Sequence, residues 1–306
     1  MNVARLVLLT LVVGALPLQA WNKPGHMVTG AISYEDLRLN HPQTLQKVIT
    51  VLTNNPYYAT RWLPKIKNTA TIGMANHDLY IFMYAARWPD DARNTAEDRP
   101  KWHYVNLPYK PAGQPSAIKP KKPPTVNILT RYPDNLVAAK LAPTAERRAI
   151  ALSWVFHLIG DVHQPLHTTA LFTTDFPNGD AGGTIFWIRA TDDSSTIHLH
   201  HFWDYLVQGS ETFTSVRNKA TSLRTQFPRT ALPQLASADF KVWAGESFTL
   251  AQTVAYRSGA LIPGTDDQSG EVLPDDYHDP AQQTAYERAT IAGYRLADVL
   301  VKLFGP

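Results

Sequence analysis

The stretch SWVFHLIGDVHQPLH, residues 153–167, places His157 and Asp161 among apolar neighbours. Apolar spacing predicts a helix over 144–162, and residues four apart share one face of a helix. A charged aspartate in apolar surroundings is costly unless something neutralises it, and an adjacent histidine and aspartate can bind one metal ion or two neighbouring ions. Pro165 ends the helix and turns the chain before His167. The stretch therefore favours a helical fold built around a metal site.

Most of the remaining chain also has helical spacing. The predicted helices lie near 25–39, 43–53, 69–86, 200–208, 236–257 and 281–303. Residues 182–204 differ, because β-branched and aromatic residues alternate on both sides of 192–195, which predicts a β-hairpin. Six prolines between 107 and 124 argue against regular structure there and favour a solvated, lysine-bearing surface loop. We expect a mainly α fold with a small β-hairpin.

The first 20 residues resemble a secretory signal. They carry one positive charge, Arg5, then an apolar run over 6–16 and a small-residue cleavage site that ends at Ala20. The run is shorter than the roughly 20 residues of a spanning helix, so an uncleaved anchor is the weaker alternative. We expect Trp21 to be the mature N-terminus and 21–306 to form one domain, without a membrane anchor after cleavage.

Composition narrows the chemistry. The chain has no cysteine, which excludes thiolate catalysis and cysteine-based zinc sites. Its formal net charge is only +3, which is weak for a protein with a polyanionic partner. Any nucleic acid must therefore be recognised locally.

The pattern of a histidine and an aspartate four residues apart occurs a second time, at His200 and Asp204. One such pair is more often a simple hydrogen-bonded pair on a helix surface. Two pairs with His167 nearby, all in apolar stretches, favour metal ligation instead. Zinc prefers imidazole and carboxylate ligands where thiolate is absent. Two further candidates, Asp90 in RWPDDAR (87–93) and His103 in KWHYVNLP (101–108), each lie close to a tryptophan.

Taken together and in order, these motifs resemble a known family. The patterns are W-x-x-x-x-H at the processed N-terminus, W-x-D-x-x-R, W-H-Y-V-N, H-L-I-G-D-x-x-Q-P-L-H and L-H-x-x-W-D. They are similar to those of the secreted zinc nucleases of the single-strand-specific type, the S-one/P-one or type I nuclease family. The motifs run from Trp21 to Asp204, about two thirds of the mature chain.

The resemblance implies a single helical domain of the zinc phospholipase C and type I nuclease kind that holds three zinc ions. By position, the first ion would take Asp90, His103, His157 and Asp161. The second ion would take His26, Asp161 as a bridge, and the α-amino nitrogen and carbonyl oxygen of Trp21. The third ion would take His167, His200 and Asp204. The amine of Trp21 can ligate only after the signal is removed.

The resemblance also implies an activity. Two neighbouring zinc ions would activate water, the third would bind the leaving oxygen, and Arg93 would neutralise charge on the phosphoryl group. Asp90 would orient the water as well as ligate. The expected substrates are single-stranded DNA and RNA, cleaved to 5′-mononucleotides, and 3′-mononucleotides. Tyr104 would stack on a base, although core packing is its simpler role.

Asn106 stands where fungal and plant members usually have aspartate, which leaves the base preference open. Cysteine is also absent, whereas disulfides are common in eukaryotic members, so we expect a bacterial protein that is periplasmic or secreted. We expect it to act as a monomer.

Two alternatives stay open at this point. The zinc phospholipases C share the fold, but typically have glutamate where this chain has Asp204, and the W-x-D-x-x-R arginine favours the nucleases. A zinc-binding protein without catalysis would have all its ions saturated by protein ligands. The remaining histidines match no ligand position: His41, His77, His163, His198, His201 and His278. We expect His163 at most to support a ligand.

Overall fold

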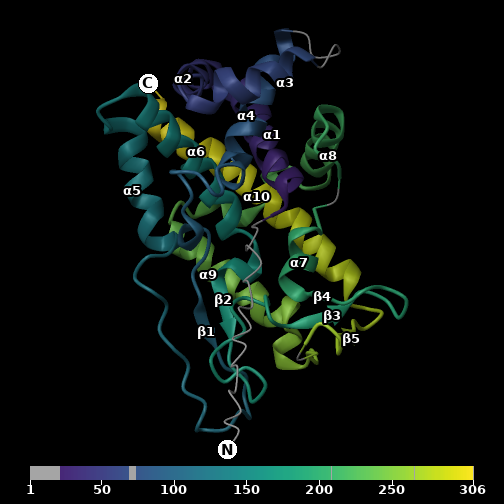
Figure 1. Cartoon of the computed structure of the whole chain (residues 1–306). Coiled ribbons are helices and arrows are strands. Elements are labelled where there is room, and N and C mark those ends of the chain that lie inside the picture. The colour runs from purple at the N-terminus through teal and green to yellow at the C-terminus, as the bar shows by residue number, and fades with distance from the viewer. Residues whose placement is uncertain (1–20, 69–73, 208, 265, 306) are drawn as a thin grey trace, which may run out of the picture.

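Four long helices form the centre of the computed structural model, which describes residues 21–68, 74–207, 209–264 and 266–305. They are α1 (Lys23–Asn40), α4 (Met74–Asp91), α6 (Ala145–Val162) and α10 (His278–Phe304). Helix α1 packs against α4 and α10, and α6 packs against the same two helices (Figure 1). The predicted signal peptide lies outside the described residues.

Shorter helices surround this centre. Helix α5 packs along α6, and α8 packs against α1 and α10 (Figure 1). The α-helices that complete the fold are α2 (Pro42–Leu52), α3 (Leu63–Asn68), α5 (Ile128–Leu141), α7 (Leu199–Asp204), α8 (Phe213–Gln226) and α9 (Phe240–Leu250). Short 3₁₀ or π turns are η1 (Tyr58–Trp62), η2 (Pro100–Trp102), η3 (Pro165–Thr168), η4 (Arg229–Ala231), η5 (Pro233–Ala236), η6 (Ala251–Ala255) and η7 (Arg257–Gly259).

Two small sheets lie at the lower end of the molecule in Figure 1. In one, β1 (Leu107–Tyr109) runs parallel to β2 (Thr169–Leu171). In the other, β3 (Trp187–Arg189) pairs antiparallel with β4 (Ile197–His198) and parallel with β5 (Glu271–Val272). Trp187 faces His198 in the antiparallel pair, so the predicted hairpin is confirmed.

The mainly α prediction is confirmed, and each predicted helix overlaps an observed one. Three details of the prediction were wrong. Helix α4 continues to Asp91, so Asp90 lies in its last turn, whereas residues 69–73 of the predicted helix lie outside the described residues. The predicted 236–257 helix begins only at Phe240, after the cap Asp239, and changes to a π turn at Ala251. The proline-rich stretch contains strand β1, which is possible because Pro108 needs no ladder N–H at a sheet edge.

Sequence reasoning missed three α-helices, the short α3 and the longer α5 and α8. Helix α5 contains Pro133, which normally argues against a helix interior, but Asn127 and Thr130 form a capping box that fixes its start. Helix α8 is polar, and its buried residues Phe213, Val216, Ala220 and Leu223 form only a narrow apolar stripe.

One continuous cluster of buried apolar side chains extends from Trp21 to Leu300. Helices α1, α4, α6 and α10 all contribute to it, so the elements that carry the candidate ligands are fixed by core packing. Within the described residues, none of the helices combines the length and the apolar character needed to span a bilayer.

Candidate metal centre

The first group of candidate ligands joins α1 to α6. His26, His157 and Asp161 are fully buried. Nε2 of His26 lies 3.3 Å from Oδ1 of Asp161, and the rings of His26 and His157 stack with their centroids 3.8 Å apart. Asn22 caps α1 by accepting a hydrogen bond from the backbone N–H of Gly25, which fixes the helix start just before His26.

The second group adds α4 and the segment after η2. Nε2 of His157 lies 2.9 Å from Nδ1 of His103 and 3.9 Å from Oδ1 of Asp90. Asp90 is buried at the end of α4, and Oδ1 accepts a hydrogen bond of 3.0 Å from Arg93. The structure thus brings together three residues that are up to 67 positions apart in sequence.

The third group lies between η3 and α7. His167, His200 and Asp204 are buried, and the Nε2 atoms of the two histidines lie 3.1 Å apart. Oδ2 of Asp204 lies 3.6 Å from Nε2 of His200, and Oδ1 lies 3.9 Å from Nε2 of His167. In each of the three groups, the candidate ligand atoms all lie within 4.8 Å of one another.

Asp161 lies between the first two groups. Its Oδ1 faces His26, whereas its Oδ2 lies 3.1 Å from Nδ1 of His103 and 3.3 Å from Nε2 of His157. The two oxygens of one carboxylate therefore face different histidines, which is the arrangement that a bridging ligand requires.

Backbone carbonyls orient three of the histidines. Nδ1 of His157 donates to the carbonyl of Ala86 (2.8 Å), Nδ1 of His167 to that of His103 (2.8 Å), and Nδ1 of His200 to that of Gly182 (2.7 Å). Since a carbonyl can only accept, each Nδ1 carries the proton and each neutral ring presents an Nε2 lone pair to its group. Sequence reasoning missed these contacts, because any residue can supply a backbone oxygen.

The segment 180–183 positions the third group. Asp180 accepts hydrogen bonds from the backbone N–H groups of Leu171 and Gly182 and from the hydroxyl of Tyr256. A Cβ atom at Gly182 would lie 2.5 Å from the carbonyl oxygen of Leu166, and the residue has φ +70°, so glycine is required there. In the sequence, only the Gly-Gly pair at 182–183 indicated this tight segment. Gln164, also missed, donates to Oδ1 of Asp204 at 2.8 Å.

Burial shifts the ionisation of the acidic candidates. It raises the pKa of Asp90 to about 6, and it raises the pKa of Asp161 and of Asp204 well above the usual range. Nearby carboxylates raise the pKa of Asp161 further. Burial also lowers the pKa of His157 to about 3, so its ring is neutral. Neutral imidazoles and ionised carboxylates are the forms that ligate a cation, and a cation removes the cost of the buried negative charge.

The donor set fits metal ions. Nε2 of His167 and Nε2 of His200 both present lone pairs across 3.1 Å, an arrangement that repels unless a cation or proton lies between them. Oδ2 of Asp90, Oδ1 of Asp161 and both ring nitrogens of His26 are buried without a hydrogen-bond partner in the described chain. Two tetrahedral zinc ligands at about 2.0–2.2 Å from the ion are about 3.4 Å apart, close to the spacings in all three groups.

Trp21 lies against the same elements. It is fully buried, and its indole N–H donates to the carbonyl of Gly160, next to Asp161, at 3.0 Å. The backbone N–H of Asn22 donates to the carbonyl of Asp204, also at 3.0 Å. Residues 21 and 22 are thus held between the first and third groups.

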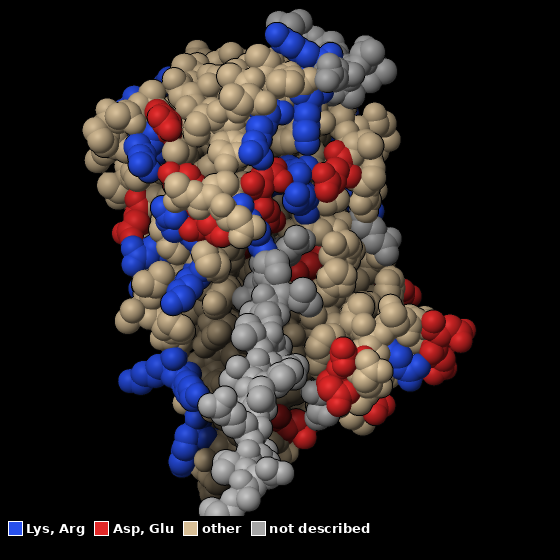
Figure 2. All heavy atoms as spheres, in the orientation of Figure 1, with Lys and Arg blue, Asp and Glu red and all other residues tan. Residues whose placement is uncertain are grey.

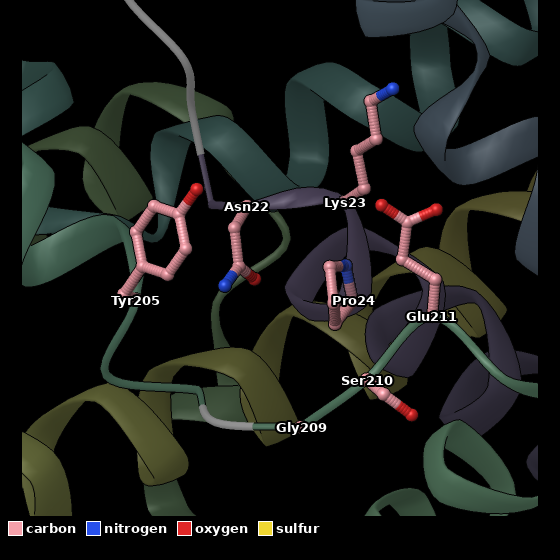
Figure 3. A pocket seen from close by; sticks show the side chains of 7 residues that line it. All are labelled: Asn22, Lys23, Pro24, Tyr205, Gly209, Ser210 and Glu211. Carbon is pink, nitrogen blue, oxygen red and sulfur yellow. The ribbon is translucent and has the colours of Figure 1, made fainter.

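The other predicted site residues lie at the edge of the centre. Arg93 is partly exposed beside Asp90, and Tyr104 and Asn106 are half-buried on the segment that follows His103. A cavity of about 410 Å³ opens beside Asn22 and Tyr205, the neighbours of Trp21 and Asp204. Figure 3 shows Tyr205 and Asn22 on one side of this cavity and Pro24 and Glu211 on the other.

The histidines that match no ligand position stay outside the three groups. His163 supports no candidate ligand directly: its Nδ1 donates to the carbonyl of Ile159, and its Nε2 accepts from Arg295. Its ring packs against Trp243 on a different side of α6.

A family model described as S1/P1 Nuclease matches residues 21–305. Nuclease S1 of Aspergillus oryzae is 28% identical over 190 residues, which cover 56% of this chain and 60% of that protein. Endonuclease 4 of Arabidopsis thaliana is 32% identical over 171 residues, 50% of each protein, and Endonuclease 5 of the same plant is 31% identical over 167 residues. The chain therefore spans about half to three fifths of the curated relatives that it matches.

Proposed function

Because the chain belongs to the S1/P1 nuclease family, we propose that it is a zinc-dependent nuclease that hydrolyses single-stranded DNA and RNA to 5′-mononucleotides. The same centre would remove the phosphate of 3′-mononucleotides. The observation that carries the metal assignment is the facing pair of Nε2 lone pairs on His167 and His200, together with the carboxylate of Asp204. The names of the curated relatives support nuclease activity over phospholipase activity.

We assign the ions as follows. The first ion would be held by Asp90, His103, His157 and Asp161. The second would be held by His26, Asp161 and the amine and carbonyl of Trp21. The third would be held by His167, His200 and Asp204. The groups found in the structure support this assignment, since every histidine and aspartate in it belongs to one of them. When bound, zinc supplies Lewis acidity and lowers the pKa of water towards neutrality.

The protein groups act around the phosphate. Oδ2 of Asp90, which has no hydrogen-bond partner in the described chain, accepts a hydrogen bond from the attacking water and orients it. The guanidinium of Arg93, held by Oδ1 of the same carboxylate, donates to the phosphoryl oxygens as their charge grows. Tyr104 stacks on an unpaired base, and Asn106 contacts the base edge. A duplex keeps its bases stacked, which explains the preference for single strands.

We also propose how the protein matures and where it acts. Residues 1–20 direct export and are removed, 21–306 form one nuclease domain, and the mature protein acts in the periplasm or outside the cell as a monomer. Removal of the signal exposes the amine of Trp21, so processing completes the second ion site.

A substrate panel tests this function. Zinc-loaded protein that begins at Trp21 is offered a single-stranded oligonucleotide, the matching duplex, 3′- and 5′-mononucleotides, and phosphatidylcholine vesicles. We expect cleavage of the single strand to 5′-phosphorylated products and release of phosphate from the 3′-mononucleotide. Hydrolysis of phosphatidylcholine alone would assign the chain to lipid cleavage, and inactivity on every substrate with full zinc content would support a structural role for the metal.

A further inference from the structure

A single stretch of the chain carries more positive charge than the net charge of the whole chain. Residues 99–133 contain five lysines and two arginines, and no aspartate or glutamate, whereas the formal net charge of the chain is +3. The rest of the chain is therefore net acidic. The middle of this stretch, residues 110–127, forms a long loop between β1 and α5, which we call the basic loop (Figure 1).

The basic loop is attached to the candidate centre at both ends. The backbone N–H of Ile128, where the loop ends, donates to the carbonyl of Tyr104, three residues before β1 begins. Strand β1 pairs with β2, whose first residue, Thr169, comes two positions after His167. The N–H of Val105 also donates to the carbonyl of His167. The loop thus starts after a strand that pairs with the segment following His167, and it returns beside the residue that we propose to stack on the base.

Local contacts hold the basic loop in one shape. Ile118 is buried against Ala170 and Phe172 in a small apolar cluster of its own. The ammonium group of Lys110 donates to the carbonyls of Pro115 and Ile118, at 2.8 and 3.1 Å. Five prolines also restrict its backbone. A loop that is already ordered loses less entropy when it binds a ligand.

Three lysines of the loop remain available to solvent. Lys119, Lys121 and Lys122 are exposed, and none of them forms an ion pair with a carboxylate of the described residues. Lys121 donates to the amide oxygen of Asn178, which leaves its charge uncompensated. Figure 2 shows basic side chains projecting along the edge where Figure 1 places the loop.

The opposite edge of the same face is acidic. The turn between β3 and β4 carries Asp192 and Asp193, and the segments around β5 carry Asp266 and Asp275. Asp276 also lies there but is paired with Arg257. Figure 2 shows acidic side chains gathered there, over the β3–β5 sheet of Figure 1. A polyanion is repelled from this edge and attracted to the basic loop, which gives a bound strand one preferred path.

We propose that the basic loop binds the phosphates of a single strand beyond the nucleotide that is hydrolysed, so that long strands are preferred over short ones. This inference rests on the proposed function for the identity of the polyanion. Lys119, Lys121 and Lys122 form the contact, which is independent of base sequence, because ammonium groups bind phosphate and the loop from 110 to 127 holds no aromatic side chain to read a base.

The salt dependence of binding tests the proposal without requiring cleavage. The affinity of the full mature protein for a fluorescent phosphorothioate oligothymidylate is measured by anisotropy between about 50 and 200 mM salt. Each single-strand phosphate contact contributes about −0.7 to the slope of log affinity against log salt. The triple variant Lys119→Gln, Lys121→Gln and Lys122→Gln should therefore have a slope that is less steep by about 2. The ratio of kcat/KM for a long strand to kcat/KM for a 3′-mononucleotide should also fall about tenfold or more.

The matched control neutralises three exposed lysines elsewhere, Lys67→Gln, Lys140→Gln and Lys241→Gln, with the same change in net charge. Its slope should stay close to that of the unaltered protein. Equal slopes for both triple variants would overturn the inference. A loop variant that binds the strand as tightly as the unaltered protein does, but binds anionic lipid vesicles more weakly, would also overturn it. If the unaltered protein cleaves nothing but the loop variant still binds the strand more weakly, the proposed function fails and the loop assignment stands.

Discussion

Asp161 is the side chain on which the geometry of the centre depends most, because its two oxygens face different histidines. Oδ1 is 3.3 Å from His26, and Oδ2 is 3.1 Å from His103. Asp204, by contrast, faces only the third group, where Gln164 also donates to it. Loss of charge at these two positions should therefore have different consequences for the number of ions bound.

We expect Asp161→Asn to lower the zinc content by up to two ions per chain and to abolish hydrolysis, since two ions would lose their shared anion. Asp204→Asn should remove at most one ion. Elemental analysis of the two purified variants makes the comparison. An Asp161→Asn protein with full zinc content and most of its activity would show that the carboxylate does not bridge.

Arg93 is partly exposed and should contribute to turnover without holding metal. We expect Arg93→Ala to lower kcat by about 10²–10³, the loss typical of one donor to a developing charge, with zinc content unchanged. Arg93→Lys should recover part of this loss. Arg147→Ala, which alters an exposed arginine paired with Glu97, serves as the control. Unchanged turnover in Arg93→Ala would reduce this arginine to a surface residue.

Asp180 predicts a pH effect on stability. Burial raises its pKa to about 6 despite three hydrogen bonds, so the folded protein binds this proton more tightly than the unfolded chain does. The stabilisation is fully present below about pH 4 and is lost as the pH rises through about 6, by up to roughly 3 kcal/mol. Relative to Asp180→Asn, which stays neutral, the unaltered protein should lose stability over this window. Denaturant unfolding at both ends measures it, and a pH-independent difference would contradict the assignment.

At the scale of elements, helix α6 supplies ligands, and at Gly160 it also leaves room for the side chain of His26 from α1. A Cβ atom at Gly160 would lie 2.8 Å from Nδ1 of His26, so α1 can bring its histidine to Asp161 only because α6 has a glycine at that turn. The ion pair of Asp91 with Lys23 ties the end of α4 to the start of α1, and Arg87, one turn earlier in α4, also pairs with Asp91. Three helices are thus fixed relative to one another at the centre.

Gly160→Ala should displace His26, lower the zinc content and destabilise the protein by about 1–3 kcal/mol through overpacking. Gly245→Ala is the matched control, because Gly245 is an exposed residue of helix α9 whose added methyl group would meet nothing within 4 Å. It should stabilise by about 0.5–1 kcal/mol. Thermal unfolding and zinc analysis compare the stability and the zinc content of the two variants. Equal behaviour would mean that the contact with His26 is not restrictive.

The elements differ in how well sequence alone predicts them. Helix α6 could be predicted because its apolar spacing and its two polar ligands agree. Helix α5 could not, because its start depends on a capping box between Asn127 and Thr130 that outweighs Pro133. At the site, His200 and Asp204 could be predicted from residue type and spacing. The carbonyls of Ala86 and Gly182 could not, since their role follows only from the packing of distant segments.

At the scale of the whole molecule, the centre lies where the start of the family match meets segments from its middle. Trp21 contacts α6, and Asn22 contacts the end of α7, so the first residues of the proposed mature chain close the centre. Processing of the chain and assembly of the metal site would then be one event. The charge separation between the basic loop and the acidic β3–β5 edge would direct the substrate to the same face.

A residue added before Trp21 should therefore act like a ligand deletion. The added peptide bond converts the amine to an amide nitrogen, a poor ligand, so we expect one zinc fewer and a steep fall in activity, both restored by trimming with an aminopeptidase. An extension after Pro306 should have no comparable effect. Three zinc ions and undiminished activity in the extended protein would leave Trp21 as a packing residue only.

Zinc titration of the metal-free protein tests the central claim most directly. Protein that begins at Trp21 is stripped of metal, zinc is returned in known equivalents, and cleavage of a single-stranded oligonucleotide is measured at each step. The account predicts no cleavage without metal and full activity only when about three zinc ions per chain have bound. Full activity in the metal-free protein, or saturation of activity at one zinc ion, would contradict it.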